Sequence, residues 1–118
     1  MQAWRIQDDH TLKLDDAEAP EPGTGQVRIA VRAVGVNRAD IMQTQGLYPA
    51  PPGFDNSVPG LEYAGVIDAV GDGVMGRKVG DRVMGLIPSA AYSEQLVVHE
   101  RETLTLPDEL DFATGATI

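Results

Sequence analysis

The chain has 118 residues, a common size for one domain with a single hydrophobic core, and no stretch approaches the roughly 20 apolar residues of a membrane-spanning helix. It contains no cysteine, which excludes disulfides, thiolate-zinc sites and a cysteine nucleophile. With 18 acidic and 9 basic residues its formal net charge is −9, which disfavours nucleic acid as a partner.

The N-terminal part predicts a hairpin followed by a long strand. Residues 1–5 lack the basic region and apolar run of a secretory signal, so we expect a cytoplasmic protein that does not bind membranes. Residues 3–6 and 11–14 flank a polar turn at residues 8–10, which is the spacing of a β-hairpin. Residues 26–34 alternate polar and apolar side chains, which predicts a strand with one buried face.

A short helix and a stiff loop are expected next. Asn37 can cap a helix over residues 38–44, which Gly46 should end. Residues 48–54 contain three prolines and therefore form an extended loop.

The remainder of the chain predicts short strands. They are expected at residues 63–70, 81–87, 92–98 and 104–107, with a tight turn at residues 71–73 between the first two. Residues 111–118 resemble the start of a helix that Asp111 caps and whose body is missing. The expected fold class is mainly β, a partly closed β-barrel with short helices.

Three segments, in this order, resemble the GroES-like catalytic domain of the medium-chain dehydrogenase/reductase superfamily: residues 35–40 (GVNRAD), 59–65 (PGLEYAG) and 79–83 (VGDRV). Residues 37–48 with the proline loop are similar to the zinc-free NAD(P)H:quinone oxidoreductase branch, and residues 106–112 extend the resemblance toward the end of the chain. Each segment is weak alone, but their order and spacing are specific. The resemblance implies that residues 1–118 are one GroES-like catalytic domain and that the Rossmann nucleotide-binding domain is absent from this chain.

The resemblance also implies hydride transfer without zinc. In the zinc alcohol dehydrogenases of the superfamily a cysteine stands at the position of Asn37 and a histidine at that of Leu61. His10 and His99 lack ligand spacing, and Glu62 alone cannot assemble a metal site. A quinone or conjugated carbonyl is already electrophilic, so the site need only align it with the nicotinamide and exclude water. We therefore expect NADPH or NADH as cofactor, bound mainly by the missing domain.

The resemblance makes three polar residues candidates for the site. Asn37 either contacts the nicotinamide ribose or a substrate carbonyl, or only caps the helix. Asp40 either orients Asn37 or the ribose hydroxyls, or only complements the helix dipole. Tyr48 either stacks on a flat quinone or nicotinamide and donates to a carbonyl oxygen, or covers the barrel end. The apolar candidates, each equally compatible with a core position, are Leu61 against the cofactor and Met42 and Phe54 against the substrate.

Two other functions stay open. Enoyl or alkenal reduction by the same zinc-free superfamily would be separated by substrate profiling. A stand-alone binding module, like the co-chaperonin of this fold, would need a long mobile loop, whereas Pro49, Pro51 and Pro52 stiffen the candidate loop here. Since the family completes this domain with a later segment, we expect this chain alone to be weakly active or inactive and to self-associate, and the whole protein to be a homo-oligomer.

Overall fold

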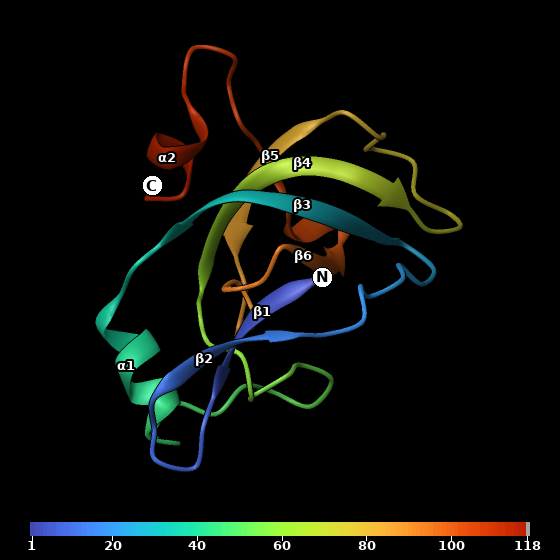
Figure 1. Ribbon diagram of the computed structural model, residues 1–118. Helices are drawn as coiled ribbons and strands as arrows, with labels where there is room; N and C mark the ends of the chain where they lie inside the picture. The colour runs from blue at the N-terminus through green and yellow to red at the C-terminus, as the bar shows by residue number, and fades with distance from the viewer. Residues whose placement is uncertain (118) are drawn as a thin grey trace.

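Residues 1–117 form two antiparallel β-sheets and short helices in the computed structural model, which describes these residues and leaves Ile118 outside (Figure 1). The elements are β1 (Gln2–Ile6), β2 (Leu12–Asp16), β3 (Gln26–Gly35), α1 (Arg38–Thr44), β4 (Glu62–Val70), β5 (Arg82–Leu86), β6 (Gln95–His99), the 3₁₀ turn η1 (Glu100–Glu102), β7 (Leu104–Thr105) and α2 (Phe112–Gly115). The prediction of a mainly β fold with short helices is confirmed. Within residues 1–117 no helix has the length and apolar character needed to cross a membrane.

The larger sheet has the strand order β6-β3-β4-β5-β7. Strand β3 pairs with β4 on one side and with β6 on the other, and its alternation buries Val27 and Ile29, as predicted. The register between β3 and β4 shifts at Arg28/Ile29 and again at Val31/Ala33. Such irregularities bend strands, and both strands curve strongly in Figure 1. The sheet built by residues 1–117 is therefore curved but open between β6 and β7.

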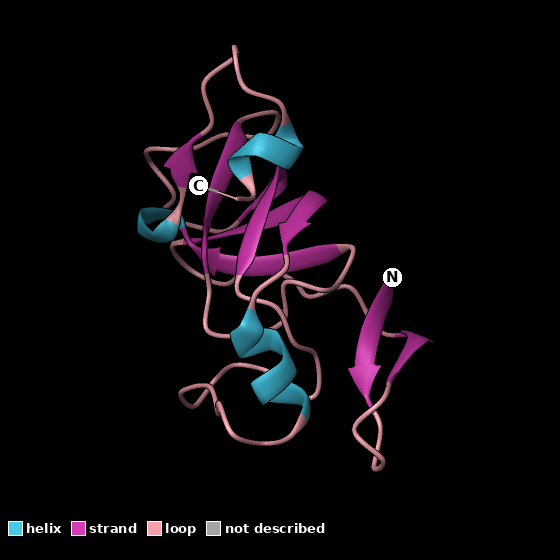
Figure 2. Cartoon of the chain, turned by 90° about the vertical axis from the view of Figure 1, so that its left-hand side faces the viewer, coloured by secondary structure: helices cyan, strands magenta, loops and turns pink. Residues whose placement is uncertain are grey.

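Strands β1 and β2 form the predicted hairpin, which stands beside the larger sheet (Figure 2). Ala3 is joined to Ser93 by an isolated β-bridge, and the backbone N–H of Trp4 donates to the carbonyl oxygen of Tyr92 at 2.9 Å. These contacts explain one difference from the sequence prediction. The strand expected from Tyr92 begins at Gln95, because the residues before it hydrogen-bond to β1.

The short helix α2 begins where the sequence predicts. The Asp111 carboxylate accepts a hydrogen bond from the backbone N–H of Thr114 at 2.7 Å and so caps the helix. Arg82 of β5 donates to the carbonyl oxygen of Leu110 at 2.6 Å, and its guanidinium lies 4.6 Å from the centre of the Phe112 ring. One side chain of the sheet therefore holds the C-terminal segment in place.

The main core lies against the curved sheet, with the central strand β4 supplying Tyr63 and Ile67. Both side chains are fully buried. The buried members of this cluster are Val27, Ile29, Tyr63, Ile67, Val83, Ile87, Ala91, Leu96 and Val98. Because they come from β3, β4, β5, β6 and the segments around them, burial of this cluster fixes the curvature of the sheet.

Truncation of the core should destabilise the chain far more than the same truncation on the surface. We expect Ile67→Ala to lower the free energy of unfolding by about 2–5 kcal/mol, since it leaves a cavity beneath β4. The matched control is Ile41→Ala on α1, where the side chain is 60% exposed and the change should stay within about 0.5 kcal/mol. Urea denaturation measures both values, and equal losses would contradict the assigned core.

Candidate functional site

Asn37 lies between the end of β3 and the start of α1, as the sequence predicts. Its backbone is extended, with φ −130° and ψ 155°, and it forms a capping box with Asp40. In this box the Asp40 Oδ2 atom accepts a hydrogen bond from the backbone N–H of Asn37 at 2.9 Å. The side-chain amide nitrogen of Asn37 donates to Glu62 Oε1, also at 2.9 Å. Asn37 is thus a helix cap that also links α1 to the first residue of β4.

Asp40 is buried, with only 4% of its surface exposed. Besides holding the backbone of Asn37, its Oδ2 atom accepts a short hydrogen bond from the Tyr92 hydroxyl. The pKa of Tyr92 is raised well above its usual value of 10.0. Burial of the phenol is the largest cause, followed by its hydrogen bond to Asp40 and the negative charge of Asp40. Tyr92 was not among the sequence-predicted site residues.

Gln43 is a second polar residue that the sequence prediction missed. It is buried, its Nε2 atom donates to the carbonyl oxygen of Pro88 at 2.9 Å, and its Oε1 atom accepts from the backbone N–H of Gly60 at 2.8 Å. Gly60 has a φ of 108°, and a side chain there would collide with Tyr92. The spacing of Asp40 and Gln43, three residues apart on one helix, is the sequence signal for a shared buried polar face.

Among residues 1–117, no side-chain hydrogen bond joins the remaining candidates to this cluster. Tyr48 lies in the loop after α1 and is 44% exposed. Met42 is half-buried on α1, and Leu61 is half-buried beside Glu62. The carbonyl oxygen of Leu61 accepts a hydrogen bond from the backbone N–H of Ile87 at 2.7 Å. Leu61 is therefore the residue just before Glu62, which the Asn37 amide contacts, whereas Tyr48 lies on an exposed loop.

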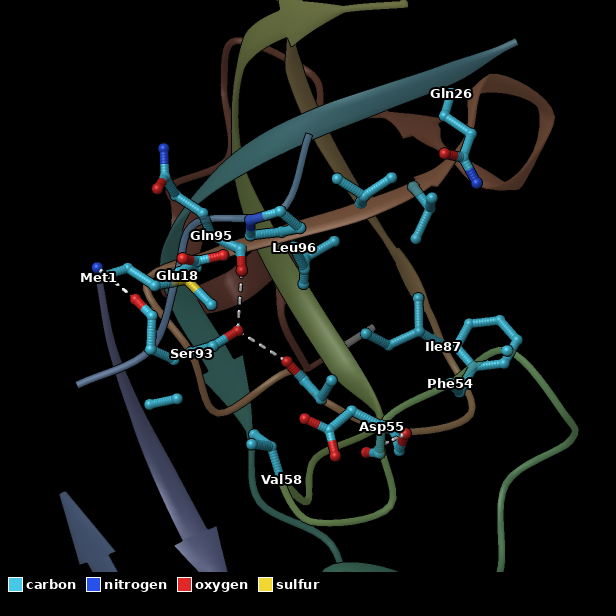
Figure 3. Close-up of a pocket in the computed structure, with 18 of the residues that line it drawn as sticks. Met1, Glu18, Gln26, Phe54, Asp55, Val58, Ile87, Ser93, Gln95 and Leu96 are labelled. Atoms are coloured by element: carbon cyan, nitrogen blue, oxygen red, sulfur yellow. Dashed lines mark hydrogen bonds between the residues drawn. The ribbon is translucent and has the colours of Figure 1, made fainter. Parts of the chain in front are cut away.

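Phe54 lies elsewhere, on the wall of a cavity of about 740 Å³ between the hairpin and the larger sheet. Figure 3 shows its ring at one end of this cavity, with Asp55 and Ile87 near it and Leu96 and Gln95 farther along the wall. Asn37, Asp40 and Tyr48 are not among the residues that line the cavity. The structure thus brings Asn37 and Asp40 together and separates Phe54 from them.

Comparison with known proteins identifies related chains. Residues 23–108 match the family model of the alcohol dehydrogenase GroES-like domain. The synaptic vesicle membrane protein VAT-1 homolog of Rattus norvegicus is 44% identical over 107 residues, which cover 91% of this chain and 26% of that protein. The chain therefore spans about a quarter of the length of this relative.

Two solved structures share both fold and sequence features. A quinone oxidoreductase of Pseudomonas syringae pv. Tomato DC3000 superposes with a TM-score of 0.83 at 40% identity, covering 98% of this chain and 35% of that chain. The Escherichia coli quinone oxidoreductase complexed with NADPH superposes with a TM-score of 0.82 at 28% identity, with the same coverage of 98% and 35%.

The contact between Asp40 and Tyr92 can be tested by alkaline titration. We expect Asp40→Asn to lower the pKa of Tyr92 toward its usual value, because the variant removes the negative charge that opposes tyrosinate formation. Tyrosinate absorbance measures the shift, and Tyr92→Phe identifies the tyrosine concerned. The control is Asp108→Asn, whose side chain is fully exposed. An identical titration curve in Asp40→Asn would contradict the contact.

The raised pKa of Tyr92 also sets a direction for stability. An unfolded tyrosine loses its proton near pH 10.0, whereas the folded protein holds it to higher pH. The contribution of this group is therefore complete below pH 10.0 and is lost as the pH rises further. We expect the alkaline fall in unfolding free energy to be shallower in Tyr92→Phe than in the unmodified chain. Parallel curves for the two proteins would count against this linkage.

Proposed function

Because the chain belongs to the alcohol dehydrogenase GroES-like domain family of the medium-chain dehydrogenase/reductase superfamily, we propose that it forms the substrate-side part of a quinone oxidoreductase. The reaction is hydride transfer from NADPH or NADH to a quinone or conjugated carbonyl. The observation that carries the proposal is the 40% identity to a quinone oxidoreductase over 98% of this chain, together with a matching fold. Since the chain spans 35% of that relative, we assign nucleotide binding to a separate domain.

The polar groups of this chain fit the nicotinamide end of such a cofactor but not its phosphates. An amide at residue 37 and a phenol at residue 48 hydrogen-bond readily to carbonyl and hydroxyl groups. The glycine turn at residues 71–73 instead connects β4 to β5, whereas a phosphate-binding turn leads from a strand into a helix. When bound, the cofactor supplies the hydride, and the chain positions the acceptor.

We propose that this chemistry proceeds without zinc. Leu61 offers no ligand atom, and Oε1 of Glu62 is engaged by the Asn37 amide. Without a metal ion, hydrogen-bond donors of the protein polarise the carbonyl group of the acceptor. The Tyr48 phenol and the Asn37 amide are the donors we assign to the acceptor pocket, with the Tyr48 ring as a wall for a planar substrate.

The exposed apolar side chains around α1 fit a surface that the rest of the protein covers. Val36, Ile41 and Leu47 are each more than half exposed, and Leu86 at the end of β5 is 68% exposed. We therefore propose that the nucleotide-binding domain or a second subunit packs here, so that this chain alone has little or no turnover.

The proposed function is tested with the full-length protein that carries this chain. We expect NADPH-dependent reduction of a small quinone, and a loss of about 100-fold in kcat/KM in the double variant Asn37→Ala plus Tyr48→Ala, because both donors are removed. A conjugated enone assayed in parallel distinguishes the enoyl reductase alternative. Glu109→Ala in an exposed loop is the control. Unchanged turnover in the double variant would refute the roles of both residues.

A further inference from the structure

The Asn37 amide is held by Glu62. Its nitrogen donates to Glu62 Oε1 at 2.9 Å, while the backbone N–H of Asp40 donates to the backbone carbonyl oxygen of Asn37 at 3.0 Å. Within residues 1–117, one of the two N–H groups on the Asn37 amide nitrogen is hydrogen-bonded. The second N–H is therefore the group that the amide can still offer to a ligand.

Glu62 decides which end of the amide faces β4. The two ends of an asparagine amide are similar in shape, so hydrogen-bond partners determine its orientation. An ionised carboxylate only accepts hydrogen bonds, and a bond from an N–H to such a charged acceptor is stronger than one between neutral groups. A flipped Asn37 would place its oxygen against the Glu62 carboxylate, so that two acceptors would face each other with no N–H between them. Glu62 therefore excludes that orientation.

The backbone fixes the Glu62 carboxylate in turn. Glu62 opens β4 and pairs with Gly35 of β3, and the next residue, Tyr63, is fully buried in the core. A side chain at position 35 would collide with Glu62 and with the carbonyl oxygen of Ala116. The glycine at this position therefore permits the close approach that brings the carboxylate to Asn37.

We propose that Glu62 is a positioning residue that holds the Asn37 amide as a hydrogen-bond donor to a carbonyl oxygen of the bound ligand. The proposal rests on the proposed function and adds a residue that acts only through Asn37. The carbonyl belongs either to the quinone or to the carboxamide of the nicotinamide. Both offer an acceptor oxygen, and the assay below separates them.

The test is a double-mutant cycle in the full-length protein with Glu62→Gln, Asn37→Ala and their combination. A glutamine at position 62 can donate as well as accept, so it lets the Asn37 amide flip. We expect each single variant to raise one ligand constant by about 3- to 10-fold, the range for one hydrogen bond, and the combination to match Asn37→Ala alone. The constants are the Kd for NADPH, from its fluorescence, and the KM for a small quinone.

The ligand constant that changes identifies the carbonyl. A raised Kd for NADPH assigns it to the carboxamide, whereas a raised KM for the quinone with unchanged Kd assigns it to the substrate. Glu109→Gln is the matched control, since that exposed side chain is in a loop away from the cluster, and it should leave both constants unchanged. Effects of Glu62→Gln and Asn37→Ala that multiply in the combination would overturn the proposal.

A reversed pair separates positioning from a purely structural role. The variant with both Asn37→Asp and Glu62→Gln can re-form the hydrogen bond with opposite polarity, and aspartate is a good helix cap. We expect its denaturation midpoint to return toward that of the wild-type protein. The affected Kd or KM should stay as high as in Asn37→Ala, because residue 37 no longer has an N–H to donate to the ligand. Recovery of the ligand constant as well would overturn the proposal.

The failure of this proposal is distinguishable from that of the proposed function. A wild-type protein that binds NADPH but reduces no quinone would contradict the proposed function, while coupling in the Kd for NADPH would still support the role of Glu62. A wild-type protein that reduces quinones while the two residues act independently would overturn only the role of Glu62.

Discussion

The buried carboxylate of Asp40 is the constraint on which the arrangement around α1 depends. A carboxylate removed from water is costly unless hydrogen bonds compensate it. Here Oδ2 accepts from the backbone of Asn37 and from the hydroxyl of Tyr92, which comes from the segment before β6, whereas the buried Oδ1 has no hydrogen-bond partner among residues 1–117. The same interaction therefore fixes the start of the helix and the position of a distant loop. Gly60 makes it possible, because a larger residue would push the Tyr92 ring away.

The curved β3–β4 pair determines what stands next to this carboxylate. Gly35 near the end of β3 is opposite Glu62 at the start of β4, so the chain leaves one strand and enters the other at the same place. Asn37 follows Gly35 by two residues and meets the Glu62 side chain across this junction. The two register shifts between β3 and β4 are of opposite sense, so Gly35 and Glu62 pair in the same register as Val27 and Val70 at the other end of the strands. The position of the polar cluster thus depends on the register of β3 and β4, which the packing of the core holds in place.

Local sequence signals predicted most of the elements. Alternation identified β3, glycines and polar residues marked the turns, and the capping residues Asn37 and Asp111 marked the starts of α1 and α2. These signals succeed because they depend on neighbours within a few residues. The start of β6 was misplaced because the Tyr92 segment bonds to β1, which lies far away in the chain. The sequence also could not show that Phe54 lies on the wall of the cavity beside the hairpin, which Asn37 does not line, because that placement depends on long-range contacts.

Composition and short-range spacing specify the β-rich fold class, the cap of α1 and a ligand set without thiolates, and these properties could be predicted from the amino acids alone. The folded chain was needed to show that the Asn37 amide faces Glu62, 25 residues away, and that Asp40 accepts from Tyr92, 52 residues away. The physical reason is that such contacts depend on the register and curvature of the whole sheet. Those are set by the collective packing of core side chains, which no local pattern encodes.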